Sequence, residues 1–142
     1  TEKDYATAYK TIREELKKFN PVLLNKKEVL VISKVDNIGV NIDKLLGKKV
    51  KVEKLKFKTK TTKQLAKLSK DEKVLYRMEL ADFKLKEKKQ KEEMKLEDKK
   101  FKEFKIKLAK LEKVSKKKVF LLSLYDDKLL KTFTQALRSQ LK

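Results

Sequence analysis

A lysine and an aspartate, separated by one residue, follow a short apolar run in the first third of the chain. Residues 29–32 are all apolar, and the next residues are Ser33, Lys34, Val35 and Asp36. A short run of this kind is typical of a strand that is buried on both faces of a parallel sheet. Open α/β sheets bind ligands at the carboxyl ends of such strands. The pattern therefore predicts that Lys34 and Asp36 lie at a ligand-binding edge.

The tetrapeptide 33–36 resembles the guanine-specificity motif of GTPases, which usually reads Asn/Thr-Lys-x-Asp. The resemblance implies that the Asp36 carboxylate accepts two N–H bonds from guanine and that the stem of Lys34 packs on the base. Such a bidentate, charge-assisted pair discriminates strongly between guanine and adenine. Ser33 departs from the motif, and its single hydroxyl predicts weakened guanine affinity. In the alternative interpretation, Asp36 only caps the turn after a strand.

The residues before this tetrapeptide extend the resemblance to the Obg family of GTPases. In that family, a helix of pattern Tyr-x-x-Ile-x-x-Glu-Leu-x-x-Tyr/Phe leads through a short linker to the guanine-recognition strand. The matching residues here are Tyr9, Ile12, Glu15, Leu16 and Phe19, followed by Asn20-Pro21-x-Leu23-Leu24-x-Lys26-Lys27. The match covers residues 5–38 in one register. It implies that GTP or GDP is bound through its guanine end.

A second match lies near the other end of the chain. Residues 119–124, Val-Phe-Leu-Leu-Ser-Leu, resemble the last strand of the same GTPase domain and the Ser-Ala-x motif that follows it. In the family, the backbone N–H of the Ala position, here Leu124, bonds the guanine carbonyl oxygen. The resemblance therefore adds Ser123 and Leu124 to the predicted site and makes strands 29–33 and 119–123 neighbours. The alternative is that Ser123 marks only the end of a buried strand.

The sequence has no Gly-x-x-x-x-Gly-Lys-Ser/Thr phosphate loop, and Gly39 and Gly47 are its only glycines. Because that loop and the metal-binding groups neutralise charge during phosphoryl transfer, we expect no GTP hydrolysis by this chain alone. The Mg²⁺ ion of a complete domain is likewise not expected to bind here. The start without Met fits a fragment. The expected fold is α/β, namely the C-terminal half of a Ras-like P-loop GTPase domain, with parallel strands and flanking helices.

Positive charge is concentrated between the two GTPase-like blocks. The chain carries +20 in all; residues 39–118, with 29 basic and 13 acidic side chains, account for +16. Motifs and charge thus predict three segments: a GTPase-domain helix, strand and guanine motif over 1–38, a basic and mostly helical insertion over 39–118, and a last strand with a C-terminal helix over 119–142. In the family, a short stretch and one helix join the two blocks, so this insertion departs from the pattern.

The insertion is predicted to be largely helical, since residues 62–113 contain neither Gly nor Pro. Two apolar stripes with steps of three and four are formed by Val74, Met78, Ala81 and Leu85 and by Phe101, Phe104, Leu108 and Leu111. One long helix would fit, and so would an antiparallel hairpin with its turn in the charged stretch 86–100. The hairpin, in which each stripe would cover the other, is favoured because strands 29–33 and 119–123 are expected to be neighbours. The insertion must then leave and return to one sheet edge, which two antiparallel helices achieve. Residues 50–59 alternate apolar residues with lysines, apart from one slip at Glu53-Lys54. They are predicted to form a strand with a bulge, either at a sheet edge or in a small hairpin.

Two interpretations of the basic insertion stay open. Its lysines interleave with Glu residues that form i,i+4 pairs on a solvated helical surface. Alternatively, the +16 segment neutralises phosphates of ribosomal RNA, with steeply salt-dependent binding; the Obg resemblance likewise implies a role in large-subunit ribosome assembly. The competing class is a basic helical RNA-binding or scaffold protein that binds no nucleotide, in which the tetrapeptide 33–36 is fortuitous.

Cysteine and histidine are both absent from the sequence. Disulfides, thiolate metal sites and histidine-based catalysis are therefore excluded. No apolar run approaches the roughly 20 residues that span a bilayer, and no signal-peptide pattern is present. We expect a soluble, cytoplasmic protein that does not bind membranes and whose exposed strand edges favour self-association. Residues 4–19 are predicted to form an amphipathic helix that begins at Asp4 as N-cap and ends at Asn20-Pro21, and Asp126 and Asp127 are predicted to cap a final helix.

Overall fold

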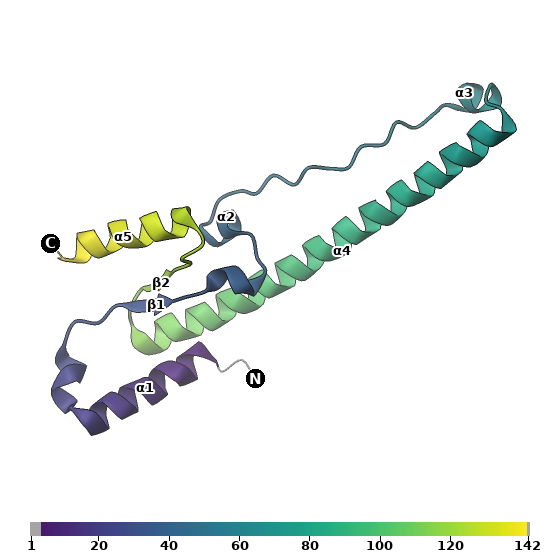
Figure 1. Cartoon of the computed structure of the whole chain (residues 1–142). Helices are drawn as coiled ribbons and strands as arrows, with labels where there is room; N and C mark the ends of the chain where they lie inside the picture. Colours follow the sequence, from purple (N-terminus) through teal and green to yellow (C-terminus); the bar gives the residue numbers. More distant parts are fainter. Residues whose placement is uncertain (1–3, 142) are drawn as a thin grey trace. The chain divides into compact units, whose positions relative to one another are not determined.

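The structure, a computed structural model, describes residues 4–141; residues 1–3 and 142 lie outside it. Figure 1 shows the elements, which are α1 (Tyr5–Phe19), η1 (Pro21–Asn25), β1 (Leu30–Ile32), η2 (Val35–Ile38), α2 (Ile42–Leu45), α3 (Thr62–Ala66), α4 (Lys70–Ser115), β2 (Val119–Leu121) and α5 (Asp127–Leu141). The chain forms two compact units. The first unit holds the described residues up to Lys49 and from Asp98 onward, and the second unit holds Val50–Glu97.

The described residues do not form a Ras-like α/β domain, so the predicted fold class is wrong. They are mostly helical, and their only strands are β1 and β2, with three residues each. The sequence offers the reason: residues 29–32 and 119–122 are its only uninterrupted runs of four apolar residues. Elsewhere the apolar residues recur at helical spacing or alternate with lysine, which favours helices and isolated extended chain over a central sheet.

β1 and β2 pair in parallel, which confirms that the two predicted strands are neighbours. The register pairs Leu30 with Val119 and Ile32 with Leu121. Burial of β1 on both faces is not found, because Val31 is 38% exposed. A sheet of two strands is too narrow to be covered by helix layers on both sides, as strands in larger parallel sheets are.

α1 ends where the sequence predicts but starts without the predicted cap. The backbone N–H of Asn20 donates to Leu16 O at 2.8 Å, and Pro21 follows. The side chain of Asp4 makes no capping hydrogen bond. α1 instead contributes to the core of the first unit, where the ring of Tyr5 meets the edge of Phe104 with 6.3 Å between centroids.

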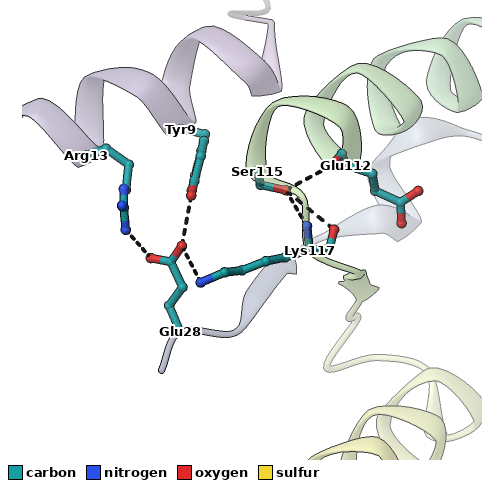
Figure 2. A network of polar contacts seen from close by, with 6 residues as sticks. All are labelled: Tyr9, Arg13, Glu28, Glu112, Ser115 and Lys117. Carbon is teal, nitrogen blue, oxygen red and sulfur yellow. Dashed lines mark hydrogen bonds and ion pairs between the residues drawn. The ribbon is translucent and has the colours of Figure 1, made fainter. Parts of the chain in front are cut away.

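A polar network around Glu28 joins α1 to the chain just before each strand (Figure 2). The Glu28 carboxylate accepts from Tyr9 Oη at 2.8 Å, from Arg13 Nη1 at 3.1 Å and from Lys117 Nζ at 2.8 Å. The hydrogen bond from Lys117 is the largest influence that lowers the pKa of Glu28 below its ordinary value of 4.5. Burial, followed by the bond to Glu28, raises the pKa of Tyr9 above 10.0. The network therefore holds a charged carboxylate and fixes where both strands begin.

α4 is one continuous helix of 46 residues, so the favoured helical hairpin is wrong. The helix begins at a capping box in which Ser69 Oγ accepts from the Glu72 N–H and the Glu72 carboxylate accepts from the Ser69 N–H, at 3.2 and 2.8 Å. No glycine or proline interrupts it. In the first unit Phe104 is buried at 4% exposure, whereas in the second unit Met78 is 65% exposed. Only the later apolar stripe is therefore covered.

Residues 50–60, called the extended segment below, run along α4 within the second unit. Gln90 Nε2 donates to Glu53 O, and the Lys60 N–H donates to Tyr76 Oη, both at 3.0 Å. The chain from Glu53 to Lys60 thus matches the helix from Gln90 back to Tyr76, which is about 21 Å at 1.5 Å per residue. Each residue of the segment spans about 3 Å, close to fully extended backbone. In the described structure the segment pairs with no strand, so the predicted strand over 50–59 is not formed.

Candidate functional site

The pairing of β1 with β2 continues beyond the last strand residues. The Leu122 N–H donates to Ile32 O at 2.8 Å, and the Val35 N–H donates to Leu122 O at 3.4 Å. Parallel strands end at the same sheet edge, so this pairing brings the segment 33–36 beside Leu122 and the residues that follow it. Two of the predicted motifs, which are far apart in the sequence, therefore meet at one edge.

At this edge a hydrogen bond connects Asp36 with Ser123. Ser123 Oγ donates to Asp36 Oδ1 at 2.6 Å. The same hydroxyl oxygen accepts from the Tyr125 N–H at 3.3 Å. Ser123 is 1% exposed and Asp36 is half-buried. The serine hydroxyl therefore fixes one carboxylate oxygen, and an ionised carboxylate retains capacity to accept further hydrogen bonds.

The backbone after Ser123 offers an unused donor. Within the described chain, the Leu124 N–H donates no hydrogen bond, while its side chain is 77% exposed. The next residues close the loop onto α5, because the Asp126 carboxylate accepts from the Leu129 N–H at 2.9 Å. This bond confirms the predicted cap at Asp126. The edge thus presents a carboxylate and a backbone donor on adjacent loops.

Lys34 adopts a strained backbone conformation, and Ser33 takes no part in the polar contacts. The φ angle of Lys34 is 56°, in the left-handed region that disfavours side chains other than those of Gly, Asn and Asp. Such outliers cluster at functional sites. Ser33 is exposed and forms no hydrogen bond with the described residues. Of the five predicted site residues, the structure thus joins Asp36 to Ser123 directly, places Lys34 and Leu124 beside them and leaves Ser33 unconnected.

The sequence reasoning missed Tyr125. Its side chain is 91% exposed and directly follows Leu124 on the loop that carries Ser123. Exposed aromatic rings are the side chains on which nucleobases stack. An aromatic residue at the third position of the Ser-Leu-Tyr tripeptide was the available signal.

A cavity of about 470 Å³ lies next to this edge in the first unit. It is lined by Tyr5, Lys34, Asn37, Ile38, Lys100, Glu103, Phe104 and Lys107. Asp36 is not part of the wall, but Lys34 and Asn37, which lie before and after it in the sequence, both line the cavity. Three lysines and one glutamate give the cavity a net positive lining. It suits an anionic group better than the base itself.

Salt links hold the surrounding loops in the first unit. Lys128 Nζ lies 2.9 Å from Asp43 Oδ1, which connects α5 with α2. Lys44 forms an ion pair with Asp98 near the start of the unit's part of α4. The hydrogen bond from Lys128 is the largest influence that lowers the pKa of the Asp43 carboxyl, and the hydrogen bond from Lys44 does the same for Asp98. Among the described residues, no group of three or more acidic side chains is placed to hold a metal ion.

No helix in the described part of the chain combines the length and apolar character that crossing a bilayer requires. Comparison of the chain with protein-family models, with curated proteins and with solved structures finds no match. The geometry of the edge and the resemblance of its motifs are therefore the basis for a functional assignment.

Proposed function

We propose that this chain binds a guanine nucleotide through Asp36, Ser123 and Leu124 at the shared edge of β1 and β2. The observation that carries the proposal is the 2.6 Å hydrogen bond from Ser123 Oγ to Asp36 Oδ1. It joins two segments, 87 residues apart, that resemble parts of one guanine site.

Three polar groups of guanine, namely the ring N–H, the amino group and the carbonyl oxygen, have complementary groups at this edge. The ring N–H and the amino group of guanine are donors, and the Asp36 carboxylate accepts from both. The guanine carbonyl oxygen accepts from the Leu124 N–H, which has no other acceptor in the described chain. Adenine presents an acceptor and no carbonyl at these positions, so it would leave both protein groups unsatisfied.

Two side chains are placed to pack against the faces of the base. The aliphatic stem of Lys34 is exposed next to Asp36, and the ring of Tyr125 is exposed next to Leu124. Stacking on an aromatic ring contributes about 1–3 kcal/mol per base and does not discriminate between purines. Affinity would therefore come partly from stacking, and specificity from Asp36. The proposal concerns binding and not hydrolysis, because the sequence has no phosphate loop.

The variant Asp36→Asn tests the proposal. An Asn side chain offers guanine one donor where an acceptor is needed, and this donor instead suits the second carbonyl oxygen of xanthine. We expect GDP affinity to fall about tenfold to a hundredfold, since a hydrogen bond to a charged group is worth roughly 1.5–3 kcal/mol. XDP should become the preferred ligand. Dissociation constants for GDP, XDP and ADP are measured by ligand-observed NMR, which covers weak binding.

Asp127→Asn is the matched control. Asp127 is an exposed carboxylate at the start of α5, close to the edge in sequence, and it forms no hydrogen bond with Ser123. The control should keep the preference for GDP over ADP and XDP. Unchanged GDP affinity in Asp36→Asn, or an equal loss in both variants, would contradict the assignment.

A further inference from the structure

We propose that three alternating lysines of the extended segment, Lys54, Lys56 and Lys58, bind the phosphodiester backbone of a single-stranded nucleic acid. We call these three residues the lysine ladder. The inference concerns the second unit and does not depend on guanine binding in the first.

The backbone of the extended segment places the ladder on its outer side. Successive side chains of an extended chain point in opposite directions. Phe57 faces α4, with its ring centroid 5.8 Å from that of Tyr76 and 5.1 Å from that of Phe83. Its neighbours Lys56 and Lys58 are exposed, as is Lys54. Alternate lysines are therefore repeated about every 6 Å along one side, since each residue of the segment spans about 3 Å.

The segment is anchored at several points, so the ladder is presented on an ordered support. Phe57 is held between two aromatic rings, and hydrogen bonds from Gln90 and to Tyr76 fix Glu53 and Lys60. A preorganised row of charges loses less conformational entropy on binding than a flexible lysine tail.

The ladder lysines have no carboxylate partners in the described structure. Lys54, Lys56 and Lys58 form neither ion pairs nor side-chain hydrogen bonds with described residues. Residues 50–68 contain seven lysines and a single acidic residue, Glu53. The net positive charge of the second unit is therefore concentrated in residues 50–68.

The part of α4 that supports the ladder carries nearly equal numbers of basic and acidic side chains, unlike the extended segment. Residues 70–97 of α4 contain nine basic and eight acidic side chains. Lys86 pairs with Asp82 and Lys91 with Glu87, each at 2.7 Å and with i,i+4 spacing. This part of α4 thus fits a solvated helical surface. The sequence left two interpretations of the basic insertion open. The solvated surface with paired charges describes this helix, and binding to a polyanion is what we propose for the extended segment.

A nucleic acid strand offers a regular row of negative charges with which the row of lysines can pair. Neighbouring phosphates of one strand are about 3.4 Å apart along the axis of a duplex, and a flexible single strand can extend to bring its phosphates into register with the ladder repeat. The contact needs no base recognition, and the ladder offers none. RNA and DNA share this chemistry, and the experiment distinguishes them.

The triple variant Lys54→Gln, Lys56→Gln, Lys58→Gln tests the ladder in the full chain. Binding of a fluorescent single-stranded RNA of mixed sequence is followed by anisotropy over a range of salt concentrations. The slope of log affinity against log salt should flatten by about 2, because each single-strand phosphate contact contributes about 0.7. Affinity at low salt should fall at least tenfold or so, and replacement of the same residues by Arg should retain it.

The matched control is Lys86→Gln, Lys88→Gln, Lys91→Gln on α4, which removes the same charge from the same unit. We expect it to bind RNA within about threefold of the unmodified chain, and single-stranded DNA of the same sequence to bind about as well as RNA. Equal losses in both triple variants would show that only net charge matters and would overturn the proposal. So would a flat salt response, tighter binding of polyglutamate than of RNA, or a strict requirement for the 2′-hydroxyl.

Discussion

Ser123 illustrates how one small side chain can organise a site. Its hydroxyl donates to the Asp36 carboxylate and accepts from the Tyr125 N–H, so it fixes the position of both loops at the edge. Only the chain partners of a nearly fully buried hydroxyl can satisfy it. Ser123 is therefore a positioning residue for the proposed guanine site, in which Asp36 and Leu124 would form the hydrogen bonds to the base.

Glu28 has a similar organising role in the first unit, where its hydrogen bonds are expected to stabilise the fold. Its carboxylate is 23% exposed and accepts three side-chain hydrogen bonds. We expect Glu28→Gln to lower the free energy of unfolding by roughly 1–2 kcal/mol at pH 7, since two of these partners are cationic. Urea unfolding measures the change. Glu14→Gln, on the exposed side of the same helix, should be within about 0.5 kcal/mol of the unmodified chain.

The effect of Glu28 should depend on pH in a defined direction. Because the pKa of Glu28 is lowered in the folded state, its contribution is fully present above the ordinary value of 4.5 and is lost as the pH falls through the lower folded-state pKa. The difference between the unmodified chain and Glu28→Gln should therefore shrink in acid. A difference that stays constant from pH 7 to well below 4.5 would show that the ionised carboxylate is not the stabilising species.

At the scale of elements, the extended segment has one aromatic anchor, Phe57, between two hydrogen-bonded points at Glu53 and Lys60. Phe57 is the segment's only ring, and it contacts Tyr76 and Phe83 on α4. The segment otherwise makes few bonds, and its backbone has no strand partner in the described structure. Loss of the Phe57 contacts should therefore allow local opening of the segment, without unfolding of the first unit.

Phe57→Ala should release the extended segment. We expect trypsin to cleave within residues 50–60 at least several-fold faster, because the lysines there become accessible to the protease in an unanchored chain. Cleavage sites and rates are followed by mass spectrometry. Val74→Ala, which truncates an exposed side chain of α4, should leave the rate nearly unchanged. Equal acceleration by both variants would show that Phe57 is not the anchor.

The sequence was sufficient for the elements whose signals are local. β1 and β2 form within the uninterrupted apolar runs, and α1 ends before Pro21. Asp126 caps α5, as its position before the helix predicted. The parallel pairing of β1 with β2, and with it the meeting of Asp36 and Ser123, was also predictable, because both motifs resemble parts of one site.

The predictions that were wrong concern how the elements are arranged in three dimensions, which local sequence patterns do not determine. The two apolar stripes of α4 were compatible with a helical hairpin. Residues 86–100, however, contain no glycine or proline to form a turn, and the helix continues through them. The alternation over 50–59 was real, yet it places Phe57 against a helix and not in a sheet. A Ras-like fold was inferred from two segments that do supply strands, although the described residues between them supply none.

At the scale of the whole molecule, the two units divide the chemistry. The first unit contains the sheet edge, the Glu28 network and the 470 Å³ cavity, and the second contains the lysine ladder. A nucleotide should therefore perturb the first unit alone, whereas the salt-dependent contact with nucleic acid should reside in the second. Because α4 belongs to both units, residues before and after Asp98 report on the two activities separately.

The most direct measurement is a titration of the ¹⁵N-labelled chain with GDP, followed by amide chemical shifts and compared with ADP under the same conditions. We predict that GDP moves the amide resonances of Asp36, Leu124 and Tyr125 most, that Leu124 shifts in the direction of a newly formed hydrogen bond, and that ADP leaves them in place. Shifts confined to the lysine ladder, or equal responses to GDP and ADP at Leu124, would contradict guanine recognition at this edge.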